Sequence, residues 1–208
     1  MSAGAAQLVA AVRAWLTEPR AGHGLVVAID GYGASGKTTI AAAAARELGA
    51  VTIHTDDFFR PAAGTDQAAA GTGRAAAGSS GVAAGTGAAA AGTGGVAAGT
   101  PATQAPMARY YDWAALRKVA LEPALAAARG AILLEGVSSS CPALADLVQR
   151  TVFVETPEPV RLARLRLRVS AQEWDEEWLA AEREYFATRP PERFDLIVPG
   201  FTNGEPCP

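Results

Sequence analysis

A short segment near the N-terminus carries the most specific chemical pattern of the chain. Gly31-Tyr32-Gly33-Ala34-Ser35-Gly36-Lys37-Thr38 matches G-x-x-x-x-G-K-[ST], the Walker A motif or P-loop, in full. Its glycines let the main chain curl so that successive N–H groups point at phosphate oxygens, and the helix that follows adds its positive end. In this motif the lysine bridges the β- and γ-phosphates and the hydroxyl binds magnesium. The segment therefore predicts ATP and Mg2+ as cofactors.

The motif also predicts which residues contact the nucleotide. An ordinary glycine-rich turn is the alternative, but the pattern lies between a buried apolar run and a helix, where phosphate binding needs it. The predicted nucleotide-binding residues are Gly31, Gly33, Ala34, Ser35, Gly36, Lys37, Thr38 and Thr39.

Acidic residues follow two further apolar runs. Asp56 and Asp57 come directly after the run 51–55, and Glu135 closes the run 131–135. In a parallel sheet the active site lies off the carboxyl ends of the strands, so one of the aspartates can accept a proton from an attacking hydroxyl. A helix or turn cap is the alternative for these aspartates. Glu135 can contribute to the magnesium shell, directly or through water, or form a structural ion pair.

Three arginines share one face of a predicted helix at 157–169. Arg161, Arg164 and Arg168 are spaced at i, i+3 and i+7. Guanidinium groups on a mobile helix can clamp ATP and stabilise the charge that develops during phosphoryl transfer. The alternative is a solvated basic face that pairs with the acidic stretch 173–177. We expect one or two of these arginines to be catalytic and Arg161 to contact the nucleotide.

Other side chains near these motifs have simpler interpretations. His54 precedes the acidic pair, and we expect it to be a core histidine. Tyr110, Tyr111 and Trp113 surround the start of a predicted helix, where they can stack on a planar substrate or fill the core. Asp112 can cap that helix.

Alternating apolar runs and helical patterns predict the elements that position these residues. The runs at 25–30, 131–135 and 151–155 are short and continuous, as is typical of strands buried on both faces of a parallel sheet. We predict strands at 25–30, 51–55, 131–135, 151–155 and 195–198, and helices at 5–16, 38–48, 112–121, 157–169 and 172–187. This order predicts a doubly wound α/β fold with right-handed crossovers. Pro123 either kinks a helix or starts the next one.

Length and composition predict a single domain in the 208 residues, interrupted by an insertion. Residues 62–105 are nearly all Ala, Gly and Thr, and such a segment cannot bury enough apolar area to offset its ordering entropy. We expect a flexible insertion without chemistry. The net charge of −3 gives no reason to expect nucleic acid or a membrane as partner. No signal peptide or spanning segment is evident, so we expect a cytoplasmic protein whose Cys141 and Cys207 are free thiols.

The motifs together resemble the uridine kinase-like family of P-loop nucleoside kinases, within the wider group that includes phosphoribulokinase. Its landmarks occur in the family's order: GYGASGKTT, TDDFFRP, YYDW, ILLEGVSSS, VFVETPEPVRLARLRLR and RPPERFDLIVPG. They cover most of the chain apart from the N-terminal helix and the low-complexity tract. The resemblance implies a P-loop NTPase fold with a five-stranded parallel sheet, in which the P-loop strand lies centrally beside the Glu135 strand.

The resemblance also implies roles for individual residues. Asp56 would be the general base on a ribose 5′-hydroxyl, while Asp112 would bind the ribose hydroxyls beside a tyrosine that contacts the base. Catalytic roles are implied for Asp56, Lys37, Arg164 and Arg168, with the arginines on a lid. Metal binding is implied for Thr38, Glu135 and Asp56. Substrate binding is implied for Asp57, Phe58, Tyr111 and Asp112.

Two departures from the family bear on the phosphate acceptor. Residues 124–130 join helix and strand almost directly, where the family has a second substrate-binding segment, and Arg168-Val169 stands where an Arg-Asp pair is common. We expect an ATP-dependent kinase acting on a hydroxyl of a small metabolite, with the 5′-hydroxyl of a uridine- or cytidine-like nucleoside as first choice. The alternatives are a sugar, pantothenate-like or antibiotic hydroxyl, or an ATP-binding regulatory module without transfer activity. The sequence predicts no particular oligomeric state.

Overall fold

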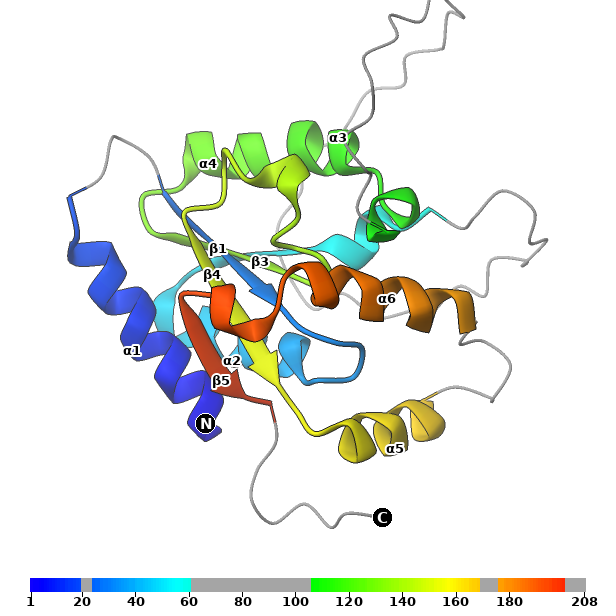
Figure 1. The fold of residues 1–208 in the computed structure, drawn as a ribbon. Coiled ribbons are helices and arrows are strands. Elements are labelled where there is room, and N and C mark those ends of the chain that lie inside the picture. Colours follow the sequence, from blue (N-terminus) through cyan, green and yellow to red (C-terminus); the bar gives the residue numbers. More distant parts are fainter. Residues whose placement is uncertain (20–23, 61–105, 169–175, 201–208) are drawn as a thin grey trace, which may run out of the picture.

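A parallel β-sheet forms the centre of the chain (Figure 1). The computed structural model describes residues 1–19, 24–60, 106–168 and 176–200. The predicted insertion at 62–105, the residues 169–175 and Cys207 lie outside this part. The strands are β1 (Leu25–Asp30), β2 (Val51–His54), β3 (Ala131–Glu135), β4 (Arg150–Glu155) and β5 (Leu196–Pro199), in the spatial order β2-β3-β1-β4-β5. The predicted strands are therefore confirmed, with β1 in the centre beside β3.

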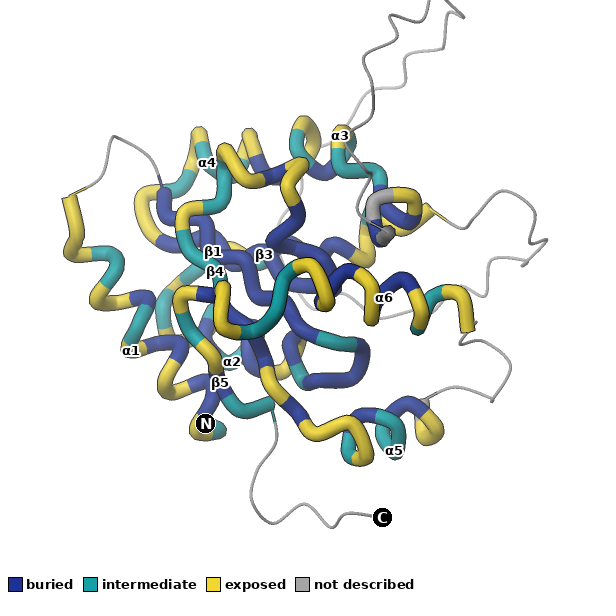
Figure 2. The backbone as a smooth tube through the Cα atoms, viewed as in Figure 1, coloured by how far each residue is buried: buried dark blue, intermediate teal, exposed yellow. Residues whose placement is uncertain are grey.

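Helices cover both faces of this sheet. The helices are α1 (Ala3–Thr17), α2 (Lys37–Leu48), α3 (Trp113–Ala115), α4 (Glu122–Ala127), α5 (Glu158–Arg168) and α6 (Glu176–Thr188). Leu25, Val27 and Ile29 of β1 point to the face that α1 and α2 cover. Val26 points to the opposite face, where α6 and the α3–α4 segment pack. This alternation explains why every residue of β1 and β3 is buried, as Figure 2 shows for the central strands.

The segment after Asp112 differs from the single predicted helix. Asp112 caps α3 as expected, by accepting a hydrogen bond from the Ala115 N–H at 2.9 Å. A wide π-helical stretch, Leu116–Leu121, follows and leads directly into α4. Pro123 lies in the first turn of α4, where its missing N–H is tolerated. It therefore starts the next helix, and the wide turns before it keep the chain helical.

Two further observations concern the chain as a whole. Along the described ranges, every helix is too short or too polar to cross a bilayer. Cys141 is a buried free thiol, as predicted, and burial raises its pKa to about 12. A thiol with so high a pKa stays protonated at neutral pH and is a poor nucleophile.

Candidate active site

The P-loop connects the central strand β1 to helix α2 through a strongly curled backbone. Gly36 has φ of 97° and forms the N-cap of α2. A Cβ atom at this position would lie 2.7 Å from the Gly200 carbonyl oxygen. Glycine is therefore required there both by the left-handed backbone and by the close approach of the chain.

The carbonyl groups of the loop are held from outside by the segment that follows β4. Thr156 Oγ1 donates a hydrogen bond to the Ser35 carbonyl at 2.8 Å. Arg164 donates to the Ala34 carbonyl at 3.2 Å, and Arg161 donates to the Gly33 carbonyl at 3.4 Å. These hydrogen bonds hold one edge of the loop in place through protein contacts alone.

Arg161 and Arg164, two of the predicted lid arginines, therefore contact the carbonyl groups of the loop. Arg161 is buried, and its guanidinium lies 4.4 Å from the centre of the Tyr32 ring. The alternative interpretation, a solvated basic face, is wrong for this residue. From the acidic stretch, Glu177 pairs instead with Arg109 at 2.8 Å. Direct contact of Arg161 or Arg164 with ATP stays a prediction, and the side chain of Arg168 is outside the described structure.

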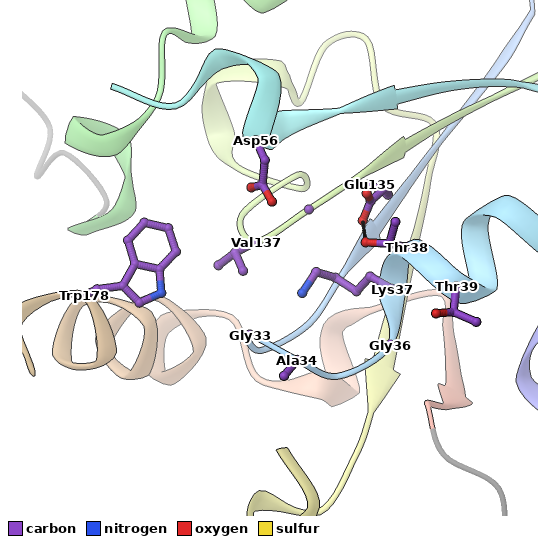
Figure 3. Close-up of a pocket in the computed structure, with 11 residues that line it drawn as sticks. Gly33, Ala34, Gly36, Lys37, Thr38, Thr39, Asp56, Glu135, Val137 and Trp178 are labelled. Atoms are coloured by element: carbon purple, nitrogen blue, oxygen red, sulfur yellow. Dashed lines mark hydrogen bonds between the residues drawn. The ribbon is translucent and has the colours of Figure 1, made fainter. Parts of the chain in front are cut away.

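A cavity of about 170 Å³ opens above the loop (Figure 3). Its lining consists of Gly33, Ala34, Gly36, Lys37, Thr38, Thr39, Asp56, Glu135, Gly136, Val137 and Trp178. Gly31 and Ser35, also predicted to bind the nucleotide, are buried and do not line it. Figure 3 shows Asp56 and Lys37 directed toward a common space, with Trp178 on α6 closing one side.

Lys37 is the positive charge of this cavity. Its Nζ donates hydrogen bonds to the Gly31 and Tyr32 carbonyls, each at 2.8 Å. Burial lowers the pKa of Lys37, while nearby carboxylates, Glu182 first among them, oppose that shift. The ammonium group is thus held at the loop by carbonyls and balanced by buried acids.

Thr38 and Glu135 meet where α2 begins and β3 ends. The Thr38 hydroxyl donates to Glu135 Oε2 at 3.3 Å, and His54 Nδ1 lies 2.5 Å from Oε1 of the same carboxylate. Glu135 is 4% exposed. A hydroxyl and a carboxylate are hard oxygen ligands of the kind that Mg2+ prefers, so these residues fit the predicted metal. The described residues hold no cluster of three or more His, Cys, Asp or Glu side chains suited to a metal.

His54 is not the core histidine that we predicted. Its side chain is 40% exposed, because β2 is an edge strand of the sheet. The hydrogen bond with Glu135 raises the pKa of the His54 imidazole, against the effect of burial. His54 therefore supports the Glu135 carboxylate from the side of β2.

Asp56 lies in a short helical turn, Thr55–Phe58, immediately after β2. Water reaches its carboxylate, but the surrounding protein atoms restrict hydration and raise the pKa of Asp56, while Lys37 opposes this shift. The Tyr111 hydroxyl donates to Asp56 Oδ1 at 3.4 Å. A carboxylate of raised pKa beside the P-loop is suited to accept a proton.

The residues predicted to bind substrate lie outside the cavity lining. Asp57 is exposed, Phe58 packs against the core, and Asp112 caps α3 and pairs with Arg60. Tyr111 is 4% exposed and contacts two residues of the lining, Asp56 and Trp178. For Tyr110, Tyr111 and Trp113 the core interpretation is confirmed. Substrate contact stays a prediction for Asp57, Phe58, Tyr111 and Asp112.

Several residues near the site were missed by the sequence interpretation. Asp30 is fully buried at the end of β1 and accepts hydrogen bonds from the Gly31 N–H, the Ser138 N–H and the Tyr185 hydroxyl. Trp178 and Glu182 lie on α6. Asp30 could have been identified in the sequence by its position at the end of a buried strand. No local sequence pattern distinguishes Trp178 or Glu182.

Comparisons with known proteins bear on the fold. No family model and no curated protein sequence matches the chain. Among solved structures, a protein described as a possible uridine kinase from Bacillus stearothermophilus matches with a TM-score of 0.52 and 16% identity, covering 93% of this chain and 96% of that one. A protein from Silicibacter sp. TM1040, provisionally named a fructose transport system kinase, matches with a TM-score of 0.48 and 18% identity, covering 96% and 100%. With its five parallel strands, the chain has the α/β P-loop NTPase fold, and the fold expected from the motifs is confirmed.

Proposed function

We propose that this chain is an ATP-dependent phosphotransferase that acts on a hydroxyl group of a small metabolite. One observation carries the proposal. Asp56, Lys37 and the Thr38–Glu135 pair line the same cavity, although they come from three different strand ends. A phosphate grip, a metal-binding pair and a proton acceptor are the parts that phosphoryl transfer requires.

In the proposed mechanism the chain binds the phosphates through the P-loop backbone, Lys37 and the N-terminus of α2. Thr38 and Glu135 would hold Mg2+, which when bound neutralises phosphate charge. Asp56 accepts the proton of the acceptor hydroxyl as that oxygen forms a bond to the γ-phosphorus. The bond from the γ-phosphorus to the bridging oxygen breaks, and the electron pair leaves with ADP. Most of the rate enhancement would come from positioning and electrostatics.

The 5′-hydroxyl of a nucleoside is the first choice of acceptor. The motif order supports it, and the first structural neighbour is described as a possible uridine kinase. A sugar, pantothenate-like or antibiotic hydroxyl is the second candidate, because α4 ends at Ala127 and β3 begins at Ala131. So short a connection has no room for a second substrate-binding segment. The net charge of −3 favours such small-molecule partners over nucleic acid or membranes.

The test is a transfer assay with ATP labelled at the γ-phosphate. A panel of nucleosides, sugars and other alcohols is incubated with the chain, ATP and magnesium, and labelled products are separated. We expect label in one chemical class of acceptor. Tight binding of ATP and magnesium with no labelled product from any acceptor would contradict the proposal and favour a regulatory module.

A further inference from the structure

A buried acid on α6 contacts the P-loop from outside the cavity. Glu182 is 2% exposed, and its Oε1 accepts a hydrogen bond from the Gly33 N–H at 2.5 Å. It does not line the cavity, and the proposed mechanism gives it no role. Placing a carboxylate out of water is costly unless hydrogen bonds and positive charges compensate it.

The compensation comes from the loop itself and from its basic neighbours. The hydrogen bond from the Gly33 N–H stabilises the Glu182 carboxylate most, and the positive charges of Lys37 and Arg161 stabilise it further. Arg161 also donates to the carbonyl of Gly33. Both backbone groups of this glycine are therefore held by charged side chains, one from α5 and one from α6.

Gly33 is a position where such support matters. It lines the cavity. It also directly follows Gly31 and Tyr32, whose carbonyls accept hydrogen bonds from Lys37. Glycine has no side chain to restrict its own backbone, so contacts with other residues must set its conformation. Phosphate binding depends on amides that are aligned before the ligand arrives.

We propose that Glu182 is a positioning residue, which fixes the shape of the P-loop through the Gly33 amide. This inference rests on the proposed function, since it assigns the loop to ATP. Trp178 lies one helical turn before Glu182, at i−4, and lines the cavity. Rings of Phe59 and Tyr110 pack against Trp178, with centroids at 5.6 and 5.0 Å. Helix α6 thus contacts the P-loop through Glu182 and forms part of the cavity wall through Trp178.

The proposed role depends on an acceptor atom at the right distance more than on its charge. Glu182→Gln keeps the length and a carbonyl acceptor but removes the charge. Glu182→Asp keeps the charge but withdraws the carboxylate by one methylene group. Glu182→Ala removes both. Glu184→Ala changes an exposed glutamate on the same helix and serves as the control.

Two measurements on the full chain test the role. Hydrogen–deuterium exchange reports on the peptide that contains residues 31–38, and calorimetry gives the dissociation constant for ATP with magnesium. We expect Glu182→Gln and Glu184→Ala to stay within about threefold of wild type in affinity, with slow exchange of the loop. Glu182→Asp and Glu182→Ala should bind ATP roughly tenfold or more weakly and exchange faster in that peptide.

The opposite pattern overturns the inference. If Glu182→Asp behaves as wild type while Glu182→Gln loses affinity, the residue acts through its charge and not by positioning Gly33. If Glu182→Ala folds and matches wild type in both measurements, the contact has no role. Should Glu182→Ala fail to fold, the Gln and Asp variants decide. A wild-type chain that binds no ATP would refute the proposed function, whereas loop exchange would still decide the role of Glu182.

Discussion

Asp56 and Asp57 are adjacent in sequence but have different surroundings. Both are exposed, but Asp56 borders the cavity and accepts a hydrogen bond from the Tyr111 hydroxyl, whereas Asp57 lies outside the lining. Restricted hydration raises the pKa of Asp56, Lys37 opposes the shift, and Glu135 adds to it. A carboxylate of raised pKa that borders the cavity is suited to the proposed role of general base.

This environment predicts the pH dependence of the reaction. A general base works only when it is deprotonated, so kcat/KM should fall as the pH is lowered through the pKa of Asp56. Because that pKa is raised, the acid limb should lie at higher pH than for an ordinary aspartate. The measurement is kcat/KM across the acid range with the best acceptor. An acid limb no higher than that of a solvent-exposed aspartate would contradict the assignment.

Glu182 predicts a second pH effect, on stability. Burial raises the pKa of Glu182, against the Gly33 hydrogen bond. When the pKa of an acid is higher in the folded than in the unfolded state, the acid is protonated in both states at low pH, and it then costs no stability. The cost appears as the pH rises above the unfolded-state pKa and is complete above the folded-state pKa. We therefore expect wild type to lose stability relative to Glu182→Gln as pH rises through this interval. Denaturant unfolding of both proteins at several pH values tests this, and a pH-independent difference would contradict it.

At the scale of elements, the end of β3 approaches the turn after β2 very closely. Gly136 has φ of 144°, and a Cβ atom there would lie 1.8 Å from Thr55 Oγ1. We expect Gly136→Ala to destabilise the fold by about 2 kcal/mol or more, through overpacking and backbone strain. The measurement is the free energy of unfolding in denaturant.

Gly130 offers a matched control, because a Cβ atom at that position meets nothing within 4 Å. Gly130→Ala should change the free energy of unfolding by no more than about 0.5 kcal/mol. Equal effects of the two substitutions would show that close packing at Gly136 does not matter.

The elements also show what the sequence can and cannot predict. The apolar runs that became β1 and β3 are buried on both faces, so their pattern was sufficient for a strand prediction. His54 was misjudged because its exposure depends on the position of β2 at the sheet edge, which no local pattern states. The wide turns before α4 likewise depend on how Pro123 fits into a continuous helical segment.

At the scale of the whole molecule, sheet order assembles the site. Strands β2, β3 and β1 are neighbours and run parallel, so Asp56, Glu135 and the P-loop meet at one edge of the sheet. This convergence could be predicted from the sequence, because parallel strands place their carboxyl ends together. The contact between Glu182 and Gly33 could not be predicted, since the partners lie 149 positions apart in the sequence. The periodicity of α6 does not reveal which group its buried acid contacts.

The central claim is that one cavity both grips a triphosphate and directs an alcohol at its terminal phosphorus. The most direct measurement compares γ-phosphate transfer and ATP affinity in Asp56→Asn with those of wild type, and Glu192→Gln, at an exposed position, is the control. We predict that Asp56→Asn binds ATP nearly as tightly as wild type but transfers phosphate at least about 100-fold more slowly. Transfer by Asp56→Asn at the wild-type rate would contradict the account.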